Sequence, residues 1–265
     1  MRHFSKILLI LILFNTNAYS QFLFKRKADT VSSNDVLYRY ERTWGLNVHS
    51  LGWGINFKKG KNINAFKKRL LEVELISMGD PKQTKISNYY LINSNSYIYG
   101  KLNSVCFLRT GFNKNILLNR KPYRGGIELR YFYSGGVSIG FAKPIYLYIA
   151  NYTFQNGYYS YFLTTEKYNP EEHFPFNVNV NGRTISIYGK ASLFKGFNKI
   201  KIYPGIYSKF GFNFDFASES SNIKKIEIGT AIDLFPIPIP IMAFCDKKYA
   251  FFTFYINFSI GKKYN

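Results

Sequence analysis

The sequence predicts an all-β fold: a single antiparallel up-and-down transmembrane β-barrel of about eight strands, with one long extracellular loop. Three observations predict it. Apolar and polar residues alternate in about eight segments, the chain opens with an export signal, and short connections contrast with one long one. The alternation is clearest near the C-terminus: Phe252, Phe254, Ile256, Phe258 and Ile260 share one parity, and Thr253, Tyr255, Asn257, Ser259 and Gly261 share the other. A two-residue period gives a strand one apolar and one polar face.

The first twenty residues read as a cleavable signal peptide. Arg2 and Lys6 form a basic region, and residues 7–14 form an apolar stretch that is too short to span a bilayer. Residues 18–20 (Ala-Tyr-Ser) place small side chains at the cleavage positions, so we expect the mature chain to begin at Gln21. The chain is therefore predicted to be exported.

The domain organisation follows from this leader and from the strand pattern. We predict a signal peptide at 1–20, an N-terminal lead-in at 21–42 and one barrel at 43–265. No later window offers about twenty uninterrupted apolar residues, so the sequence predicts no transmembrane helix.

Eight segments carry the alternation of strands. They are 43–57, 68–78, 104–113, 125–134, 137–149, 200–216, 226–234 and 252–261.

The first two predicted strands differ in regularity. In 43–57 the apolar parity slips near Ser50, which predicts a β-bulge. Residues 60–62 (Gly-Lys-Asn) are predicted to form the turn. In 68–78, apolar residues alternate with Glu72 and Glu74, so the acidic parity would face the lumen.

The middle strands have less uniform patterns. In 104–113 both parities carry large apolar residues, so its outward face stays open. Gly135 and Gly136 separate 125–134 from 137–149 and are typical of a two-residue hairpin turn.

The last three strands have clear faces. Aromatic residues occupy one parity of 200–216, and residues 218–222 form a polar turn. Three prolines in 235–242 cannot donate to a ladder, so we predict a stiff extended loop there before the final strand.

The connections fit a barrel whose N-terminus lies in the periplasm. The 135–136 and 218–222 turns would be periplasmic and short, and the long excursion 150–199 would be extracellular. Segment 79–103 breaks this rule because it would be periplasmic yet long. A further hairpin within it would raise the strand number to ten.

Charged residues on the polar parity are predicted to meet inside the lumen. Those assigned to this charge network are Glu72, Glu74, Arg109, Glu128, Arg130, Glu227 and Asp233. Buried charges must be paired, so we interpret them as a salt-bridged plug. The alternative is a proton or ion path, or a gate. Long aromatic rows are too large for the lumen of a soluble eight-stranded barrel, which favours an outward apolar face.

Few residues suit catalysis or metal binding. Outside the leader the histidines are His49 and His173. His49 precedes Ser50, but adjacent strand residues point to opposite faces, so a Ser/His/acid esterase is disfavoured. Residues 171–173 (Glu-Glu-His) are a weak metal motif. We predict no catalytic residue, metal or cofactor. We expect no disulfide, because Cys106 would lie toward the periplasm and the other cysteine near the extracellular rim.

The long loop is rich in aromatic residues. Those that suggest a contact surface for a protein partner are Tyr152, Phe154, Tyr158, Tyr159 and Tyr161. The alternative is a loop that packs on itself as a cap. Residues 191–197 are predicted to form a short helix or turn.

The formal net charge of +21 has two explanations: an anionic partner such as lipopolysaccharide, or a bias toward A/T-rich codons, which also enriches Asn, Ile, Tyr and Phe. The export signal disfavours nucleic acid.

Several stretches resemble outer-membrane β-barrel proteins of the Bacteroidota to which no activity is assigned. They are Ala18–Gln21, Tyr99–Ser104, Gly125–Tyr131, Lys143–Leu147, Phe194–Phe197 and Tyr203–Gly205. The resemblance covers most of the mature chain. It implies an outer-membrane location and insertion by the barrel-assembly machinery. The chain departs from the usual aromatic C-terminus, since Asn265 follows Tyr264.

These observations predict a non-enzymatic outer-membrane barrel with a structural, binding or secretion-accessory role. The alternatives are a lipid-modifying outer-membrane enzyme and a soluble lipocalin-like binding barrel.

Overall fold

This computed structural model describes residues 38–91, 93–121, 126–155, 158–173, 178–180, 183–217 and 221–265. All of them belong to one compact unit, Val36–Asn265. The predicted signal peptide and residues 21–37 of the predicted lead-in lie outside the described residues. Within the described part of the chain, no helix is long and apolar enough to cross a bilayer.

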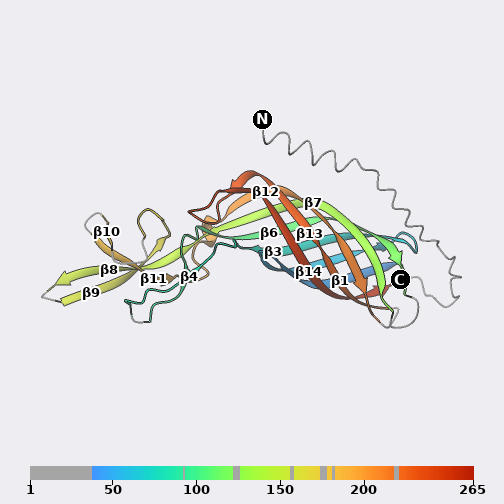
Figure 1. The fold of residues 1–265 in the computed structure, drawn as a ribbon, viewed down its shortest axis with the longest axis horizontal. Coiled ribbons are helices and arrows are strands. Elements are labelled where there is room, and N and C mark those ends of the chain that lie inside the picture. The colour runs from blue at the N-terminus through green and yellow to red at the C-terminus, as the bar shows by residue number, and fades with distance from the viewer. Residues whose placement is uncertain are drawn as a thin grey trace, which may run out of the picture. The chain divides into compact units, whose positions relative to one another are not determined.

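Eight antiparallel strands close into a barrel in the order β1-β14-β13-β12-β7-β6-β3-β2 (Figure 1). They are β1 (Tyr40–His49), β2 (Gly52–Asn62), β3 (Lys67–Met78), β6 (Asn103–Asn119), β7 (Glu128–Pro144), β12 (Lys201–Asp215), β13 (Asn222–Ile239) and β14 (Lys248–Tyr264). Neighbouring strands in the barrel are also consecutive in the chain, apart from the two long connections and the closing pair β1–β14. The predicted fold class, an up-and-down barrel of eight strands, is confirmed.

A second sheet occupies the connection between β7 and β12. Its order is β10-β11-β8-β9, formed by β8 (Tyr146–Gln155), β9 (Tyr158–Lys167), β10 (Val178–Val180) and β11 (Arg183–Lys190). A 3-10 turn, η1 (Phe197–Lys199), then leads into β12. The long predicted loop 150–199 is therefore mostly sheet. Two short strands, β4 (Lys85–Ile86) and β5 (Tyr97–Ile98), pair within the β3–β6 connection.

The two ends of the barrel carry different connections. At one end, which we call the terminal end, β1 begins and β14 ends, and the connections 63–66, 120–127 and 216–221 are short. The other end, the loop end, carries the long connections 79–102 and 145–200. The predicted asymmetry therefore holds. Segment 79–102 no longer breaks it, because it lies at the loop end.

The first predicted strand is in fact a hairpin. Its parity slip at Ser50 is not a bulge: the chain reverses at residues 50–51, and His49 pairs with Gly52. The turn predicted at 60–62 is also wrong, because these residues continue β2 against β3. A two-residue turn and a one-residue bulge both switch the parity of the apolar face, so alternation alone did not distinguish them.

The hairpin predicted at Gly135 and Gly136 is wrong as well. Both residues lie inside β7, which runs unbroken against β6 and β12. A Cβ on Gly136 would lie 2.2 Å from the carbonyl oxygen of Thr110, so this glycine allows a close backbone approach rather than a reversal. One predicted strand was split and two were joined, which left the count at eight.

The proline-rich stretch is less loop-like than predicted. Strand β13 continues to Ile239, although its pairing with β14 shifts between Leu234 and Ile239. Pro236 and Pro238 lie in this irregular part, where a missing backbone donor is tolerated.

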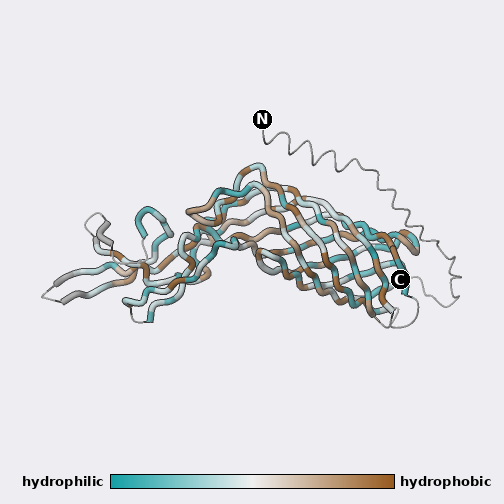
Figure 2. The backbone as a smooth tube through the Cα atoms, in the orientation of Figure 1, coloured by the Kyte–Doolittle hydropathy of each residue, from teal (hydrophilic) through white to brown (hydrophobic). Residues whose placement is uncertain are grey.

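The apolar parity of the barrel faces outward. Hydrophobic and hydrophilic residues alternate along its strands (Figure 2). Phe254 on β14 is 61% exposed and Trp44 on β1 is 61% exposed, whereas the inward Glu72 and Glu227 are fully buried. The predicted orientation, with aromatic side chains outside and carboxylates inside, is correct. On 104–113 the structure decides the open question: Phe107 and Arg109 point inward and Phe112 points outward.

Candidate functional site

Seven ionic side chains from five strands meet in the middle of the lumen. We call this group the central charge cluster: Lys58, Glu72, Glu74, Arg109, Lys209, Glu227 and Asp233. Each lies on the inward parity of its strand, and each is at most 1% exposed. The cluster therefore exists only because the sheet closes on itself.

Two lysines bridge three glutamates. Nζ of Lys209 lies 2.7 Å from Oε1 of Glu72 and 2.6 Å from Oε1 of Glu74. Nζ of Lys58 lies 2.9 Å from Oε1 of Glu72 and 2.6 Å from Oε2 of Glu227. Glu72 is thus shared by both ammonium groups, which ties β2, β3 and β12 together inside the barrel.

The arginine closes the other side of the cluster. Nε and Nη2 of Arg109 donate to the two carboxylate oxygens of Asp233, with Nε···Oδ1 at 2.9 Å. Nη1 of Arg109 lies 3.3 Å from Oε2 of Glu74. Ser138 donates to Oδ1 of Asp233 at 2.9 Å. A bidentate pair of this kind is geometrically specific and strong.

The central charge cluster fills the lumen rather than lining a channel. Its three cations and four carboxylates contact one another directly, and the Tyr255 hydroxyl donates to Oε1 of Glu227 at 2.8 Å. Ions taken out of water in this way remain charged only while they are paired. An eight-stranded barrel has room for little more than its own side chains. The arrangement therefore suits a closed barrel better than a pore.

A second group of ionic side chains lies nearer the terminal end. We call it the terminal charge cluster: Glu41, Lys68, Lys121, Glu128, Arg130, Asp215 and Lys225. Lys68 lies 2.7 Å from Glu41, and Arg130 lies 2.5 Å from Glu128. A cavity of about 20 Å³ sits among these residues, enough for a single water molecule.

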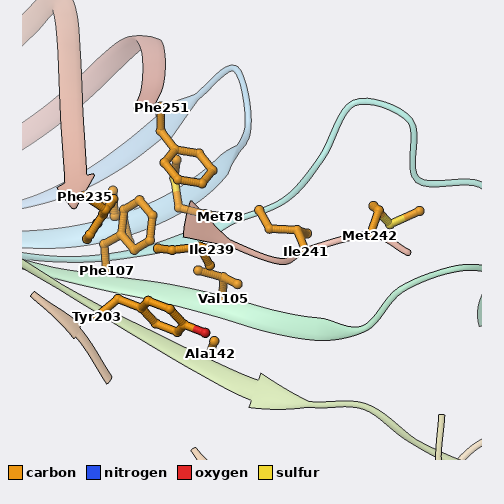
Figure 3. Packing of buried hydrophobic residues seen from close by; sticks show 11 residues of the cluster. Met78, Val105, Phe107, Ala142, Tyr203, Phe235, Ile239, Ile241, Met242 and Phe251 are labelled. Carbon is orange, nitrogen blue, oxygen red and sulfur yellow. The ribbon is translucent and has the colours of Figure 1, made fainter. Parts of the chain in front are cut away.

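An apolar plug closes the lumen at the loop end. It consists of Ile76, Met78, Val105, Phe107, Ala142, Tyr203, Phe235, Ile239, Ile241, Met242 and Phe251. Figure 3 shows the rings of Phe107, Phe235 and Phe251 grouped together. The Phe107 ring lies 4.8 Å from that of Phe235 and 5.2 Å from that of Phe251, centroid to centroid. The lumen is thus ionic at its centre and dry at one end.

The structure separates the seven residues that the sequence assigned to the lumen into two places. Five belong to the central charge cluster: Glu72, Glu74, Arg109, Glu227 and Asp233. Glu128 and Arg130 instead pair with each other in the terminal charge cluster, where Arg130 also donates to the carbonyl of Phe66 at 3.1 Å.

Sequence reasoning missed several partners of these charges. Lys58 was not assigned because the predicted strand ended one residue before it, yet it continues the inward parity of Asn56. Glu41 lay in the predicted lead-in, and Lys68 stood at a predicted strand start. Extending the alternation by one period would have found Lys58 and Glu41, whereas Lys68 already shared the inward parity of Glu72 within its predicted strand.

His49 does not form a catalytic arrangement. Its Nδ1 accepts a hydrogen bond from the backbone N–H of Leu51 at 3.3 Å, which shapes the β1–β2 turn. The neighbouring Ser50 is exposed in that turn, whereas His49 points into the barrel. A hydroxyl nucleophile therefore does not reach this imidazole from the adjacent position.

His173 lies in the second sheet region with both ring nitrogens engaged. Nδ1 accepts from the backbone N–H of Asn169 at 3.1 Å, and Nε2 lies 3.3 Å from Oε2 of Glu166. The Thr164 hydroxyl donates to Oε1 of the same glutamate at 2.8 Å. No ring nitrogen is left to activate a nucleophile. Among the described residues, no group of three His, Cys, Asp or Glu side chains could hold a metal.

The aromatic residues predicted to form a contact surface lie on the β8–β9 hairpin. Tyr152 and Tyr161 are directly opposite, with ring centroids 5.8 Å apart. Tyr161 and its neighbours Phe162 and Leu163 are exposed. The side chains of the other three, Phe154, Tyr158 and Tyr159, lie outside the described residues. Strand β9 is an edge strand of this sheet, so one row of its backbone N–H and C=O groups has no partner strand among the described residues.

The base of the second sheet is held by hydrogen bonds to the rest of the chain. The backbone N–H of Gly100 donates to the Tyr168 hydroxyl at 3.3 Å, and the N–H of Ile145 donates to the carbonyl of Leu102 at 2.9 Å. Burial raises the pKa of Tyr168 to about 12, so its hydroxyl stays protonated at neutral pH. These contacts join the two long connections of the loop end.

The cysteines lie closer along the barrel than predicted. Cys106 is near the start of β6 and Cys245 is in the β13–β14 connection, so both belong to the loop end. Cys106 was expected at the end of the barrel that carries the chain termini, but it lies at the loop end, because the hairpin at residues 50–51 reverses the direction of the strands that follow it. Both thiols are free.

Comparison with known proteins yields structures but no family. Neither a protein-family model nor a curated protein matches the chain. Neisserial surface protein A is similar in structure with a TM-score of 0.37 at 7% identity, over 86% of this chain and 98% of its own. Ail, the attachment invasion locus protein of Yersinia pestis, gives 0.36 at 8% identity, over 85% and 97%.

A further structure of Ail, in complex with the heparin analogue sucrose octasulfate, gives 0.35 at 7% identity, over 85% of this chain and 97% of its own. Such low values transfer no function to this chain. The fold stands on the strand pairing described above.

Proposed function

We propose that this protein is a non-enzymatic outer-membrane β-barrel that spans the membrane with a closed lumen and acts through the sheet at its loop end. The observation that carries the proposal is the reversed polarity of the barrel. Large apolar side chains cover the outside, and fully buried ion pairs fill the inside. A water-soluble barrel needs the opposite arrangement, whereas lipid stabilises this one.

The proposed orientation puts the terminal end in the periplasm and the loop end outside the cell. Short turns at the periplasmic side and long connections at the outer side are the usual pattern of such barrels. We further propose export by the signal peptide at 1–20 and insertion by the barrel-assembly machinery. These steps are supported by the sequence pattern of the leader and by the closed antiparallel topology.

The role within the membrane is proposed to be structural or binding rather than transport. The central charge cluster and the apolar plug occupy the lumen, which disfavours a diffusion pore. The exposed hairpin, with Tyr161 on one face and Phe162 on the other, supports a protein partner for the 150–199 region. Outer-membrane lipid, including lipopolysaccharide, would surround the barrel.

The outward apolar side chains of the barrel strands form a band that we call the apolar belt. The membrane location is tested by placing one charge on this belt. Ile256→Arg should abolish or strongly reduce heat-modifiable gel migration and carbonate-resistant membrane fractionation. Ile256 is the middle of the five outward apolar residues on β14, and arginine in the middle of a lipid face costs about 2–4 kcal/mol. Leu163→Arg, at an apolar position of similar exposure outside the barrel (46%, against 44% for Ile256), is the matched control. A freely soluble wild-type protein, or equal tolerance of both variants, would contradict the proposal.

The binding role is tested by the hairpin. A complex recovered in mild detergent from the native cell should be lost with Tyr161→Ser/Phe162→Ser and kept with Phe194→Ser, an exposed aromatic residue beside η1. Loss in both variants, or in neither, would argue against a specific partner at this sheet.

The second candidate function is a lipid-modifying enzyme, in which His49 or His173 would have to serve as the catalytic base. His49→Ala and His173→Ala should leave the lipid A mass profile of the cell unchanged, because neither imidazole is positioned to activate a nucleophile. A changed profile in either variant would replace the non-enzymatic proposal.

A further inference from the structure

Charge is divided between the two faces of the barrel wall. Every Asp and Glu on the barrel strands points into the lumen: Glu41, Glu72, Glu74, Glu128, Asp215, Glu227 and Asp233. The ionic residues on the outward parity of these strands are all basic. All charged side chains on the outside of the barrel wall are therefore cationic. The lumen, in contrast, contains both acidic and basic side chains.

Most of the outward basic residues gather at the terminal end of five neighbouring strands. On β3, β2, β1, β14 and β13, the apolar outward positions give way to Lys or Arg on the terminal side of Leu71, Phe57, Trp44, Ile260 and Ile226. We call these residues the basic rim: Lys67, Arg69, Lys59, Lys61, Arg42, Lys262 and Lys224. All of them are exposed.

The strand register places members of the basic rim directly opposite one another. Arg42 pairs with Lys59 on one side and with Lys262 on the other, and Lys61 pairs with Arg69. Like charges directly opposite on adjacent strands repel. Among the ion pairs of the described residues, none includes a member of the rim. An anion from outside the chain would relieve this repulsion.

Aromatic rings lie between these charges. The Tyr40 and Tyr264 rings stack at 5.7 Å, and the guanidinium of Arg42 lies 5.9 Å from the centre of the Tyr264 ring. Trp44 lies one outward position further into the apolar belt. Tyr and Trp beside Lys and Arg are typical of the level at which a membrane protein meets lipid headgroups.

The basic residues lie on one side of the barrel. Beyond β3 they continue only to the half-buried Lys114 on β6, which is directly opposite Arg69. On β12 and β7 the outward positions at the terminal end stay apolar, with Phe216 and Ile127 both exposed. A general lysine excess would be expected to spread over all eight strands. At this end, the described parts of β12 and β7 carry no outward Lys or Arg, so the outward basic residues are concentrated on the other six strands.

We propose that the basic rim binds the phosphate groups of anionic glycerophospholipids in the leaflet at the terminal end of the barrel. This inference rests on the proposed membrane-spanning function, which puts that end on the periplasmic side. Phosphate is the anion available at that depth, and adjacent Lys and Arg heads above an apolar belt can hold it while the acyl chains lie on the belt.

The test uses the full chain folded into three kinds of vesicle: phosphatidylcholine alone, phosphatidylcholine with phosphatidylglycerol, and phosphatidylcholine with lipopolysaccharide. The rim variant is Arg42→Gln/Lys59→Gln/Lys262→Gln, and the matched control is Lys190→Gln/Lys195→Gln/Lys199→Gln near the loop end. Lipid that stays bound is counted by native mass spectrometry after extraction in mild detergent.

Wild type and control should retain phosphatidylglycerol in preference to phosphatidylcholine, and the rim variant should lose this preference by about tenfold or more. Unchanged retention in the rim variant, an equal loss in the control, or a loss confined to lipopolysaccharide would overturn the inference. Folding in phosphatidylcholine alone, read by heat-modifiable migration, tests the proposed function separately. A wild-type protein that fails there contradicts the membrane barrel itself.

Discussion

The ammonium group of Lys58 lies 2.6 Å from Oε2 of Glu227, although the two residues are 169 positions apart in the chain. Lys58 is on β2 and Glu227 is on β13, with β1 and β14 between them in the sheet. The bond therefore crosses the inside of the barrel. This bond forms only because the barrel closes, and it is one of the shared ion pairs of the central charge cluster.

Removal of the Lys58 charge should destabilise the barrel strongly. Lys58→Met leaves Glu227 and Glu72 short of a buried partner, which costs about 3–5 kcal/mol. Urea unfolding in lipid vesicles measures the free energy of unfolding. The exposed Lys190→Met should change it by less than about 0.5 kcal/mol.

A double-mutant cycle separates the pair from the lysine's other contacts. The double variant Lys58→Met/Glu227→Gln should lose less unfolding free energy than the sum of the losses in the two single variants. In the double variant neither charge of this pair is left buried without the other. Strict additivity would show that the two groups do not interact across the lumen.

Truncation in the apolar plug should leave a cavity. Phe107 is fully buried and packs against Phe235 and Phe251, so Phe107→Ala is expected to cost about 3–5 kcal/mol. Phe194→Ala, at an exposed position, serves as the control and should have little effect. The same unfolding measurement applies. Equal effects of the two substitutions would mean that the plug does not stabilise the barrel.

Two neighbouring glycines should respond differently to one added methyl group. Gly136→Ala would bring Cβ to 2.2 Å from the Thr110 carbonyl oxygen, whereas the Cβ of Gly135→Ala would meet nothing closer than 3.5 Å. Overpacking of this kind costs about 1–3 kcal/mol. The yield of heat-modifiable folded barrel and its midpoint of urea unfolding should fall for Gly136→Ala alone. A larger loss for Gly135→Ala would restore the hairpin interpretation.

The Asp80–Lys248 pair at the loop end should make stability depend on acid pH. Burial alone would raise the pKa of Asp80, but the hydrogen bonds from Lys248 (2.6 Å) and from the Lys82 N–H outweigh it and lower the pKa below its usual value. A carboxyl whose pKa is lower in the folded state stabilises above its unfolded pKa, about 3.9, and loses that contribution as pH falls through the folded value.

Asp80→Asn should therefore cost about 1 kcal/mol or less near neutral pH and nearly nothing well below pH 4, because the pair is partly exposed. The measurement is the difference in unfolding free energy between wild type and variant across that pH range. A difference that grows toward acid would reverse the assigned sign. Lys247→Gln, next to the lysine partner, should show no comparable pH dependence.

The sequence by itself determined the fold class and, in every predicted strand except 104–113, the face that turns outward. A two-residue period leaves only two faces, so the row from Phe252 to Ile260 and the parity of Glu72 and Glu74 could be assigned without coordinates of any kind. It also predicted that buried charges would be paired, since unpaired ions are not tolerated inside a barrel.

Only the tertiary structure decided how far each strand runs and which charges meet. A hairpin at Ser50 and a bulge there shift the parity alike, and Gly135 and Gly136 suit a turn or a close strand approach equally well. Lys58 and Glu227 become neighbours through register and closure. These are properties of the whole sheet, and local alternation carries no information about them.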